Sequence, residues 1–237
     1  YNPVIDSFFY AISINNLIVG IVVIFLLFRN NKSNEQMSLK EYFSYSKSNF
    51  KKIRLDQAVG LIPQHLDVVI IGFFADFYSA GIYRIAKKLV EPINYIVVAF
   101  SPWMLNKIEN HQRYDFRKLT LQVLFPITFF LIFVYLFFGD YLISFVAGND
   151  YQESFVPMII LLFGYIVYFI TFWTRHYLLL NNLILKHTIG RIINLIIFII
   201  SSSILITEFS FNGIASSISL GMISQKIYEV YVYAKNK

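Results

Sequence analysis

Apolar stretches long enough to span a membrane recur along this chain of 237 residues, and no other feature of the sequence restricts its fold so strongly. A transmembrane helix needs about 20 mostly apolar residues. About seven stretches meet that requirement, and they are Val4–Phe28, Leu55–Phe77, Tyr78–Leu105, Leu119–Phe138, Ser154–Leu180, Thr188–Thr207 and Phe211–Tyr233. The sequence therefore predicts an all-α, polytopic transmembrane helical bundle of about seven spanning helices.

The composition agrees with a location in the membrane. Hydrophobic residues make up 57% of the chain and charged residues 14%, whereas soluble domains carry about 25% charged residues. The 25 phenylalanines and 17 tyrosines suit contact with lipid and the aromatic belts at the membrane surface. The chain has no cysteine, which excludes disulfide bonds and cysteine-based metal sites. The composition thus favours a membrane protein over a soluble domain.

The positions of the basic residues predict how the helices are oriented. Most of the 20 lysines and arginines lie on alternate connections, with a large group on Arg29–Arg54 and others around Arg175, Arg191 and Lys237. The opposite connections carry acids such as Asp140 and no Lys or Arg. Because basic connections stay on the cytoplasmic side of a membrane, we expect the connection Arg29–Arg54 and the C-terminus to be cytoplasmic.

Ionisable residues occur inside the third apolar stretch. At about 100° per residue, one narrow helical face carries Arg84, Lys88, Glu91 and Tyr95, flanked by Lys87 and Asn94. Charged groups at membrane depth are costly, so they usually face the interior of a bundle or a water-filled cavity. We therefore interpret this helix, together with the one before it, as one wall of a transport cavity.

The second stretch offers a complementary polar face. Helical projection groups Asp56, Gly60, Pro63, Gln64 and Asp67 on that face, while His65 points away. Gly60 has no side chain and lets another group approach the backbone closely. From the two helices together, the predicted substrate-binding residues are Arg84, Lys87, Lys88, Glu91, Asp67 and Gln64.

Two interpretations of these charges stay open. In the first, they form a hydrated, net-cationic surface that holds an anionic headgroup, since Arg contacts phosphate groups bidentately and Lys acts as a point charge. In the second, Asp67 and Glu91 each pair with a basic residue and hold the bundle closed. Both can be true in different states of a transporter.

Other functional classes lack their sequence signatures. The four histidines show no metal-ligand spacing, and the chain has no nucleophile elbow, no phosphate-binding glycine loop and no Walker sequence. We therefore expect neither an enzyme nor a metal ion or other cofactor. The segment Ser38–Ser48 is basic with interleaved aromatic residues, a pattern typical of a helix in the headgroup plane. Nucleic acid is accordingly not an expected partner.

Short motifs follow one another from the second stretch to the end of the third. An acid on one helix is followed by an Ile-Gly-Phe run, then by a turn, and after the turn by Ala-Gly-Ile-Tyr-Arg and a lysine-bearing helix that ends in Ser-Pro. These are Asp67, Ile71-Gly72-Phe73, Ala80-Gly81-Ile82-Tyr83-Arg84, Lys87-Lys88 and Ser101-Pro102. In this order the chain resembles the polysaccharide flippases of the multidrug/oligosaccharidyl-lipid/polysaccharide exporter superfamily. Gly139–Ser154 is similar to the family's outer-face turn, and Phe211–Ala215 to the glycine-containing start of a late helix.

The resemblance implies a fold of two six-helix lobes around a central cavity. It makes residues 1–28 the last helix of the first lobe, residues 29–54 a basic cytoplasmic linker with an interfacial helix, and residues 55–237 the second-lobe transmembrane bundle. The chain begins at Tyr1, without an initiator Met, and enters an apolar run almost at once. We therefore expect it to lack the N-terminal lobe of the same protein.

Members of this family move undecaprenyl-pyrophosphate-linked oligosaccharide units across the bacterial inner membrane for O-antigen, lipopolysaccharide or capsule synthesis. The resemblance thus implies a multi-pass flippase of that membrane, in contact with lipids, with the lipid-linked oligosaccharide and with a coupling ion, H⁺ or Na⁺. It implies Arg84, Lys87 and Lys88 as cavity residues, with Asp67 opposite. Two alternatives stay open: a cation-coupled multidrug exporter of the same superfamily, whose cavity we expect to be acidic, and a membrane polysaccharide polymerase, which needs a larger outer loop.

Overall fold

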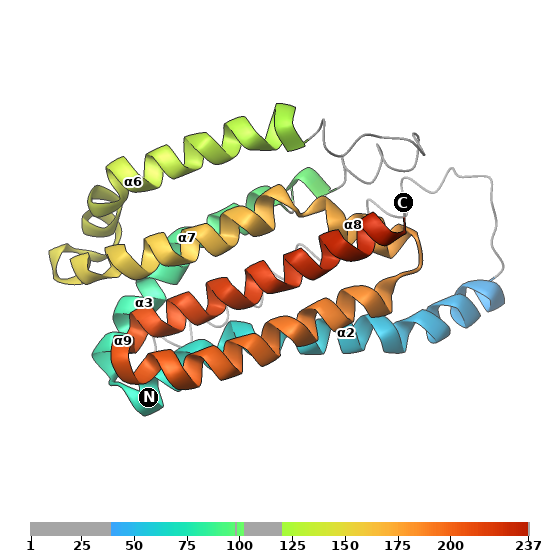
Figure 1. Cartoon of the computed structure of the whole chain (residues 1–237), viewed down its shortest axis with the longest axis horizontal. Coiled ribbons are helices and arrows are strands. Elements are labelled where there is room, and N and C mark those ends of the chain that lie inside the picture. Colours follow the sequence, from blue (N-terminus) through green and yellow to red (C-terminus); the bar gives the residue numbers. More distant parts are fainter. Residues whose placement is uncertain (1–38, 98, 102–119, 237) are drawn as a thin grey trace, which may run out of the picture. The chain divides into compact units, whose positions relative to one another are not determined.

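Every regular element in the described part of the chain is helical, as the apolar stretches predict (Figure 1). The computed structural model describes residues 39–97, 99–101 and 120–236. Its elements are α2 (Leu39–Phe74), α3 (Phe77–Val90), the π-helical turn η1 (Thr120–Leu124), α6 (Phe125–Ala147), the 3₁₀ turn η2 (Asn149–Ser154), α7 (Phe155–Ile170), α8 (Trp173–Leu180) and α9 (Ile184–Lys235). The first predicted span, Val4–Phe28, lies outside the described residues.

In the part of the chain that the structure describes, four helices are long and apolar enough to cross a membrane, judged by their length and composition. They lie at Arg54–Phe74, Gln122–Ala147, Asn149–Ile170 and Ile184–Lys235. This confirms the expected all-α class and the multi-pass membrane character of the chain. All four belong to the unit Asn49–Lys237, one of the two units into which the chain divides, the other being Tyr1–Ser48.

The longest helix, α9, is folded into two arms at Ser210. This residue adopts φ 48° and ψ −128°, which is not helical, and it separates residues 184–209 from residues 211–235. Figure 1 shows the two arms running side by side in opposite directions. Each arm exceeds the length of about 20 residues that a span needs. The last two predicted spans therefore correspond to the two arms of α9.

The third predicted span is broken near its middle. Asp76 caps the N-terminus of α3 by accepting a hydrogen bond from the backbone N–H of Ser79 at 2.6 Å. Helix α3 ends at Val90, just before Pro92. Proline has no N–H to continue the helical bonding pattern, and a separate helical segment, residues 92–97, follows the break. Over the described residues, two short helical segments thus replace the predicted continuous helix.

Helix α6 runs further than the sequence predicts. The outer-face turn expected at Gly139–Ser154 begins only after Ala147, where α6 ends. Gly139 belongs to the helix and makes room for α7, because a Cβ there would lie 2.7 Å from the end of the Met158 side chain. The turn itself is at Gly148, whose φ of 95° suits glycine. The first glycine of the expected turn segment is therefore a packing residue within α6.

The fifth predicted span, Ser154–Leu180, consists of two helices. Helix α7 ends at Ile170 and α8 begins at Trp173. The break includes Thr171, whose hydroxyl donates a hydrogen bond to the carbonyl of Val167 at 2.5 Å. Such a side-chain bond to the backbone often bends a helix. The predicted single helix is therefore corrected to α7 followed by α8.

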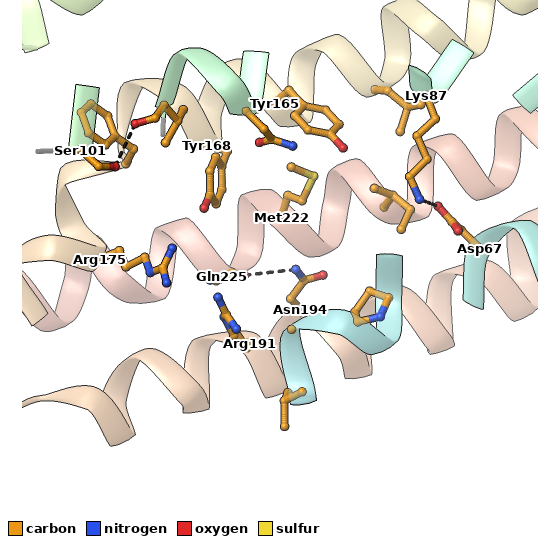
Figure 2. Close-up of a pocket in the computed structure, with 18 of the residues that line it drawn as sticks. Asp67, Lys87, Ser101, Tyr165, Tyr168, Arg175, Arg191, Asn194, Met222 and Gln225 are labelled. Carbon is orange, nitrogen blue, oxygen red and sulfur yellow. Dashed lines mark hydrogen bonds and ion pairs between the residues drawn. The ribbon is translucent and has the colours of Figure 1, made fainter. Parts of the chain in front are cut away.

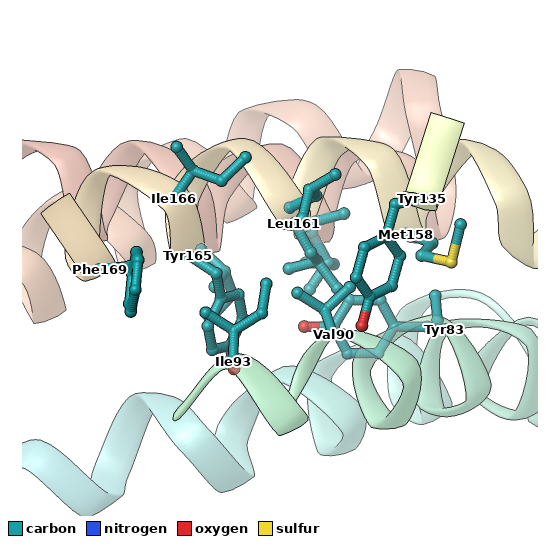
Figure 3. Close-up of a cluster of buried hydrophobic side chains, with 14 of the residues drawn as sticks. Tyr83, Val90, Ile93, Tyr135, Met158, Leu161, Tyr165, Ile166 and Phe169 are labelled. Atoms are coloured by element: carbon teal, nitrogen blue, oxygen red, sulfur yellow. The ribbon is translucent and has the colours of Figure 1, made fainter. Parts of the chain in front are cut away.

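Helix α7 lies at the centre of the hydrophobic core (Figure 3). Buried side chains of α3, α6 and α9 surround it, and the figure labels Tyr83, Val90, Ile93, Tyr135, Met158, Leu161, Tyr165, Ile166 and Phe169. Helix α9 approaches α7 closely at Gly164, where a Cβ would lie 2.9 Å from the Cα of Ser219. The Tyr135 hydroxyl donates to the Leu89 carbonyl at 2.5 Å, beside the break in the third span. This packing fixes the helices that form the cavity.

Candidate functional site

A cavity of about 340 Å³ lies between α2, α3, α7, α8 and the two arms of α9 (Figure 2). Its polar lining residues are Asp67, Tyr83, Lys87, Asn94, Ser101, Tyr165, Tyr168, Arg175, His176, Arg191, Asn194 and Gln225. Figure 2 shows the pair Asp67 and Lys87 at one end and Arg175 at the other. The volume lies within the range of small-ligand sites, about 300–1,000 Å³.

An ion pair between α2 and α3 lies at one end of the cavity (Figure 2). The Nζ of Lys87 lies 2.5 Å from Oδ2 of Asp67, and the Tyr83 hydroxyl donates to the same oxygen at 2.7 Å. The side chain of Asp67 is fully buried, and that of Lys87 is 12% exposed. A buried carboxylate is costly unless it is paired and hydrogen-bonded. These donors therefore neutralise Asp67 and hold the two helices together.

The predicted stripe on α3 lies outside the cavity lining. Lys88 pairs with Glu91 at 2.6 Å, and 62% of the Lys88 side chain is exposed. Arg84 is exposed and forms no hydrogen bond or ion pair with the residues that the structure describes. The face of α3 that lines the cavity is the neighbouring one, with Tyr83 and Lys87. Both acids thus pair with a lysine, as the second interpretation of these charges expects.

The structure brings three of the five residues on the predicted polar face of α2 into the cavity lining. Gly60, Pro63 and Asp67 line the cavity, whereas His65 is exposed. The side chain of Gln64 lies outside what the structure describes. That these residues, or those of the stripe on α3, bind a substrate stays a prediction.

Two arginine side chains line the opposite end of the cavity (Figure 2). Arg175 is on α8, and Arg191 is on the first arm of α9. The Nη1 of Arg191 lies 3.2 Å from Oδ2 of Asp56 and donates to the Asp56 carbonyl at 2.5 Å. The guanidinium group packs against Gly60, the residue at which the sequence predicts a close approach. Helix α2 thus holds Arg191 in a fixed orientation.

A buried polar network lies beside these arginines. The fully buried Glu229, on the second arm of α9, accepts hydrogen bonds from Thr174 at 2.5 Å, from Gln225 at 2.7 Å and from Lys226 at 2.7 Å. The Nδ1 of His187 lies 2.9 Å from Glu229 Oε1. Because these residues come from α8 and from both arms of α9, the network fixes the helices that carry the two arginines.

His187 extends this network towards α2. Its Nε2 is buried and has no hydrogen-bond partner among the described residues, and it lies 3.8 Å from Oδ1 of Asp56. The hydroxyl of Thr188 donates to the same oxygen at 3.3 Å. Asp56 therefore joins the first arm of α9 through several contacts, and it is 5% exposed. The sequence places Asp56 on the polar face of α2 but does not identify these partners.

The charge distribution of the sequence assigns Arg175 and Arg191 to a cytoplasmic connection, whereas the structure places them in the cavity lining. One signal was available for Arg191. His187, Arg191 and Asn194 recur at i, i+4 and i+7, the spacing of one helical face. Tyr168, Phe172 and Arg175 also recur at i, i+4 and i+7 and line the cavity, so the same spacing, continued across the break at residues 171–172, indicates Arg175 as well.

Among the described residues, no group of three or more His, Asp or Glu side chains is arranged to hold a metal ion. No family model matches the chain, and neither a curated protein nor a solved structure is similar to it. The cavity has cations at both ends and tyrosine side chains between them.

Proposed function

We propose that this chain is part of a flippase that moves undecaprenyl-pyrophosphate-linked oligosaccharides across the bacterial inner membrane for surface polysaccharide synthesis. The charge of the cavity carries the proposal. The lining contains three cations, Lys87, Arg175 and Arg191, and one carboxylate, Asp67. Ionisable residues inside a membrane bundle mark pathways for substrates or ions. An anionic pyrophosphate headgroup supplies the negative charge that this lining lacks.

The neutral part of the lining suits the sugar units. Tyr165, Tyr168 and Ser101 bring hydroxyl groups, and Leu161 and Met222 form part of an apolar wall. A tyrosine offers a flat apolar ring and a polar tip, and ligand sites commonly combine apolar walls with a few polar groups that fix orientation. Sugars have both apolar faces and hydroxyl edges, so they match this mixture.

The proposal includes the finer fold, in which the chain supplies the second six-helix lobe and the helix before it. Transporters of this kind work by rocking one lobe against another around the substrate. The exposed Arg84 and Lys88 of α3, with the half-buried Glu91 that follows the helix, support this arrangement. A first lobe opposite that face would enclose a second charged surface. The predicted binding roles of these residues belong to this part of the proposal.

The two alternative functions receive less support. A multidrug exporter for organic cations needs carboxylates in its cavity. Among the described lining residues only Asp67 has one, and Lys87 neutralises it at 2.5 Å. A membrane polymerase needs polar groups that converge at an outer loop, whereas Asp140 and Asp150 are exposed and lie outside the cavity lining. We therefore retain the flippase as the single proposal.

Transport in reconstituted vesicles tests this proposal. The complete natural protein is inserted into liposomes that contain a fluorescent polyprenyl pyrophosphate, and movement between leaflets is followed by dithionite quenching. We expect movement that an imposed H⁺ or Na⁺ gradient accelerates, and no movement with residues 1–237 alone. A rate equal to that of protein-free vesicles under both gradients would contradict the flippase. Transport by residues 1–237 alone would contradict the two-lobe part of the proposal.

A further inference from the structure

Among the described residues, no acid pairs with Arg175 at its end of the cavity. Its Nε is buried, and no residue that the structure describes accepts a hydrogen bond from it. A buried charged donor without a partner is destabilising, and in native proteins such a group often marks the place of a ligand or ion. Arg175 lines the cavity, so the space beside it is where a partner can bind (Figure 2).

Arg191 brings a second guanidinium group to the same end. Figure 2 shows both arginine side chains turned towards this part of the cavity. Arg191 uses Nη1 for its contacts with Asp56, which fixes its orientation. Asp56 balances the charge of Arg191, and Glu229 balances that of Lys226 at 2.7 Å. Within the described part of the chain, the positive charge of Arg175 thus stays without an acid.

A tyrosine hydroxyl lies at the same place. Tyr168 lines the cavity, and Figure 2 shows its hydroxyl directed towards the arginines. The Nζ of Lys226 lies 4.4 Å from the centre of the Tyr168 ring, a contact that steadies the ring. The hydroxyl forms no hydrogen bond with the described residues. The nearby amides of Asn194 and Gln225, in contrast, bond to each other at 3.1 Å.

We propose that Arg175, Arg191 and the Tyr168 hydroxyl form a binding site for a phosphate-type oxyanion. Guanidinium forks match the oxygens of a phosphate group, and charge-assisted hydrogen bonds of this kind are the strong ones. Lys87, at the other end, is already neutralised by Asp67. The inference rests on the proposed function, which makes the ligand the pyrophosphate of a lipid-linked oligosaccharide. Free pyrophosphate shares the same chemistry.

The position of the site fits the direction of transport in that proposal. The connection between α8 and α9 is predicted to be cytoplasmic, and Arg175 and Arg191 lie on either side of it in the sequence. In the proposed function the lipid-linked precursor starts in the cytoplasmic leaflet, so its headgroup would meet these arginines first. The sugar units would then extend towards Tyr165 and the end with Lys87.

Binding to the purified complete protein tests the site by isothermal titration calorimetry. The probes are inorganic pyrophosphate in detergent and a short-chain polyprenyl pyrophosphate in phosphatidylcholine nanodiscs. We expect Arg175→Gln to weaken binding of both probes about ten- to a hundredfold. Arg175→Lys should recover part of the affinity, because the charge returns without the fork. As a control, Lys186→Gln removes an exposed charge of α9 outside the cavity lining and should bind as the natural protein does.

Unchanged affinity of Arg175→Gln for inorganic pyrophosphate overturns the site, and so does a natural protein that binds neither probe. If Arg175→Gln fails to fold, Arg175→Lys and Tyr168→Phe decide, since full affinity in both variants overturns the site as well. Tighter binding of the lipid probe assigns the ligand to a lipid headgroup, and equal binding assigns it to the pyrophosphate group alone. The vesicle assay separates the two proposals. If the natural protein binds pyrophosphate through Arg175 but does not flip the lipid probe, the proposed function is wrong and the site stands. If the natural protein flips the probe but Arg175→Gln binds pyrophosphate as tightly as the natural protein, the site is wrong and the function stands.

Discussion

Gly60 of α2 lies directly against the guanidinium group of Arg191 on α9, so that a Cβ at residue 60 would fall 2.7 Å from the Arg191 Cζ. Arg191 at the same time pairs with Asp56, one helical turn before Gly60. The glycine and the aspartate together determine where this arginine can lie. Because Arg191 lines the cavity, the packing of α2 against α9 determines where this positive charge lies in the cavity.

We predict that Gly60→Ala weakens binding of pyrophosphate about tenfold while changing the melting temperature little. The atoms that a new Cβ meets are the far end of a flexible side chain, so Arg191 can swing aside without moving the backbone. Arg191 would keep its ion pair with the buried Asp56 but turn its other nitrogen atoms away from the anion, and one charge-assisted contact is worth about a factor of ten. Calorimetry and thermal melting of the purified protein measure both effects.

Gly72→Ala is the matched control for this change. It lies on the same helix, and a Cβ there meets nothing within 4 Å. We expect unchanged binding and a stability that is equal or about 0.5–1 kcal/mol higher, since alanine favours a helix over glycine. Equal binding in Gly60→Ala and Gly72→Ala would show that the position of Arg191 does not matter for the anion.

We predict a different result for Gly164→Ala in α7. Here a Cβ would lie 2.9 Å from the Cα of Ser219, a backbone atom of α9 that cannot swing aside. Extra methyl groups in a packed core cost about 1–3 kcal/mol. Chemical denaturation in detergent should therefore show a clear loss of stability, whereas Gly60→Ala shows little. A Gly164→Ala protein as stable as the natural one would mean that α7 and α9 pack less closely.

The spans were predictable because the membrane tolerates only helices with satisfied backbones, so length and hydropathy suffice to locate them. The breaks within the predicted spans arise at two kinds of residue, a proline and a threonine. Pro92 could be read directly, since proline interrupts a helix. Thr171 could not, because a threonine within an apolar run bonds either to the helix or away from it. Glycine is common in turns, yet Gly139 lies inside α6 and leaves room for the Met158 side chain.

The candidate site was predicted only in part, for a geometrical reason. Helical projection correctly groups Arg84, Lys88 and Glu91 on one face, but it cannot indicate which face neighbouring helices cover. Lys87, one residue before Lys88, is on the face that lines the cavity. The charge count assigns Arg175 to a connection because it lies near the end of a predicted span, whereas the structure directs it into the cavity (Figure 2).

The predicted orientation can be tested with single cysteines, because the chain has none of its own. Asn149 and Asn181 are both exposed, and they lie at connections predicted to be on opposite sides of the membrane. We expect Asn149→Cys to react with an impermeant maleimide on intact cells, and Asn181→Cys to react only after the membrane is opened. The reverse pattern would invert the topology and place the arginine end of the cavity outside.

The last prediction separates the two interpretations of the charges on α2 and α3. Lys87→Met leaves the fully buried carboxylate of Asp67 without its cation, and breaking a buried pair from one side costs about 3–5 kcal/mol. Asp67→Asn combined with Lys87→Met removes both charges and should recover most of that loss. Lys88→Met, which breaks the exposed pair with Glu91, should cost about 0–1 kcal/mol. Unfolding free energies in detergent measure all three variants.

Transport by the stable double variant then decides what the pair does. If the buried pair only holds α2 against α3, the double variant flips the lipid probe as fast as the natural protein does, since its helices remain joined by the Tyr83 hydroxyl and the asparagine at position 67. If Lys87 or Asp67 contacts the substrate, the protein stays folded and the flipping rate falls. Losses of stability that simply add in the double variant would mean that the two side chains are not coupled, against the 2.5 Å contact between them.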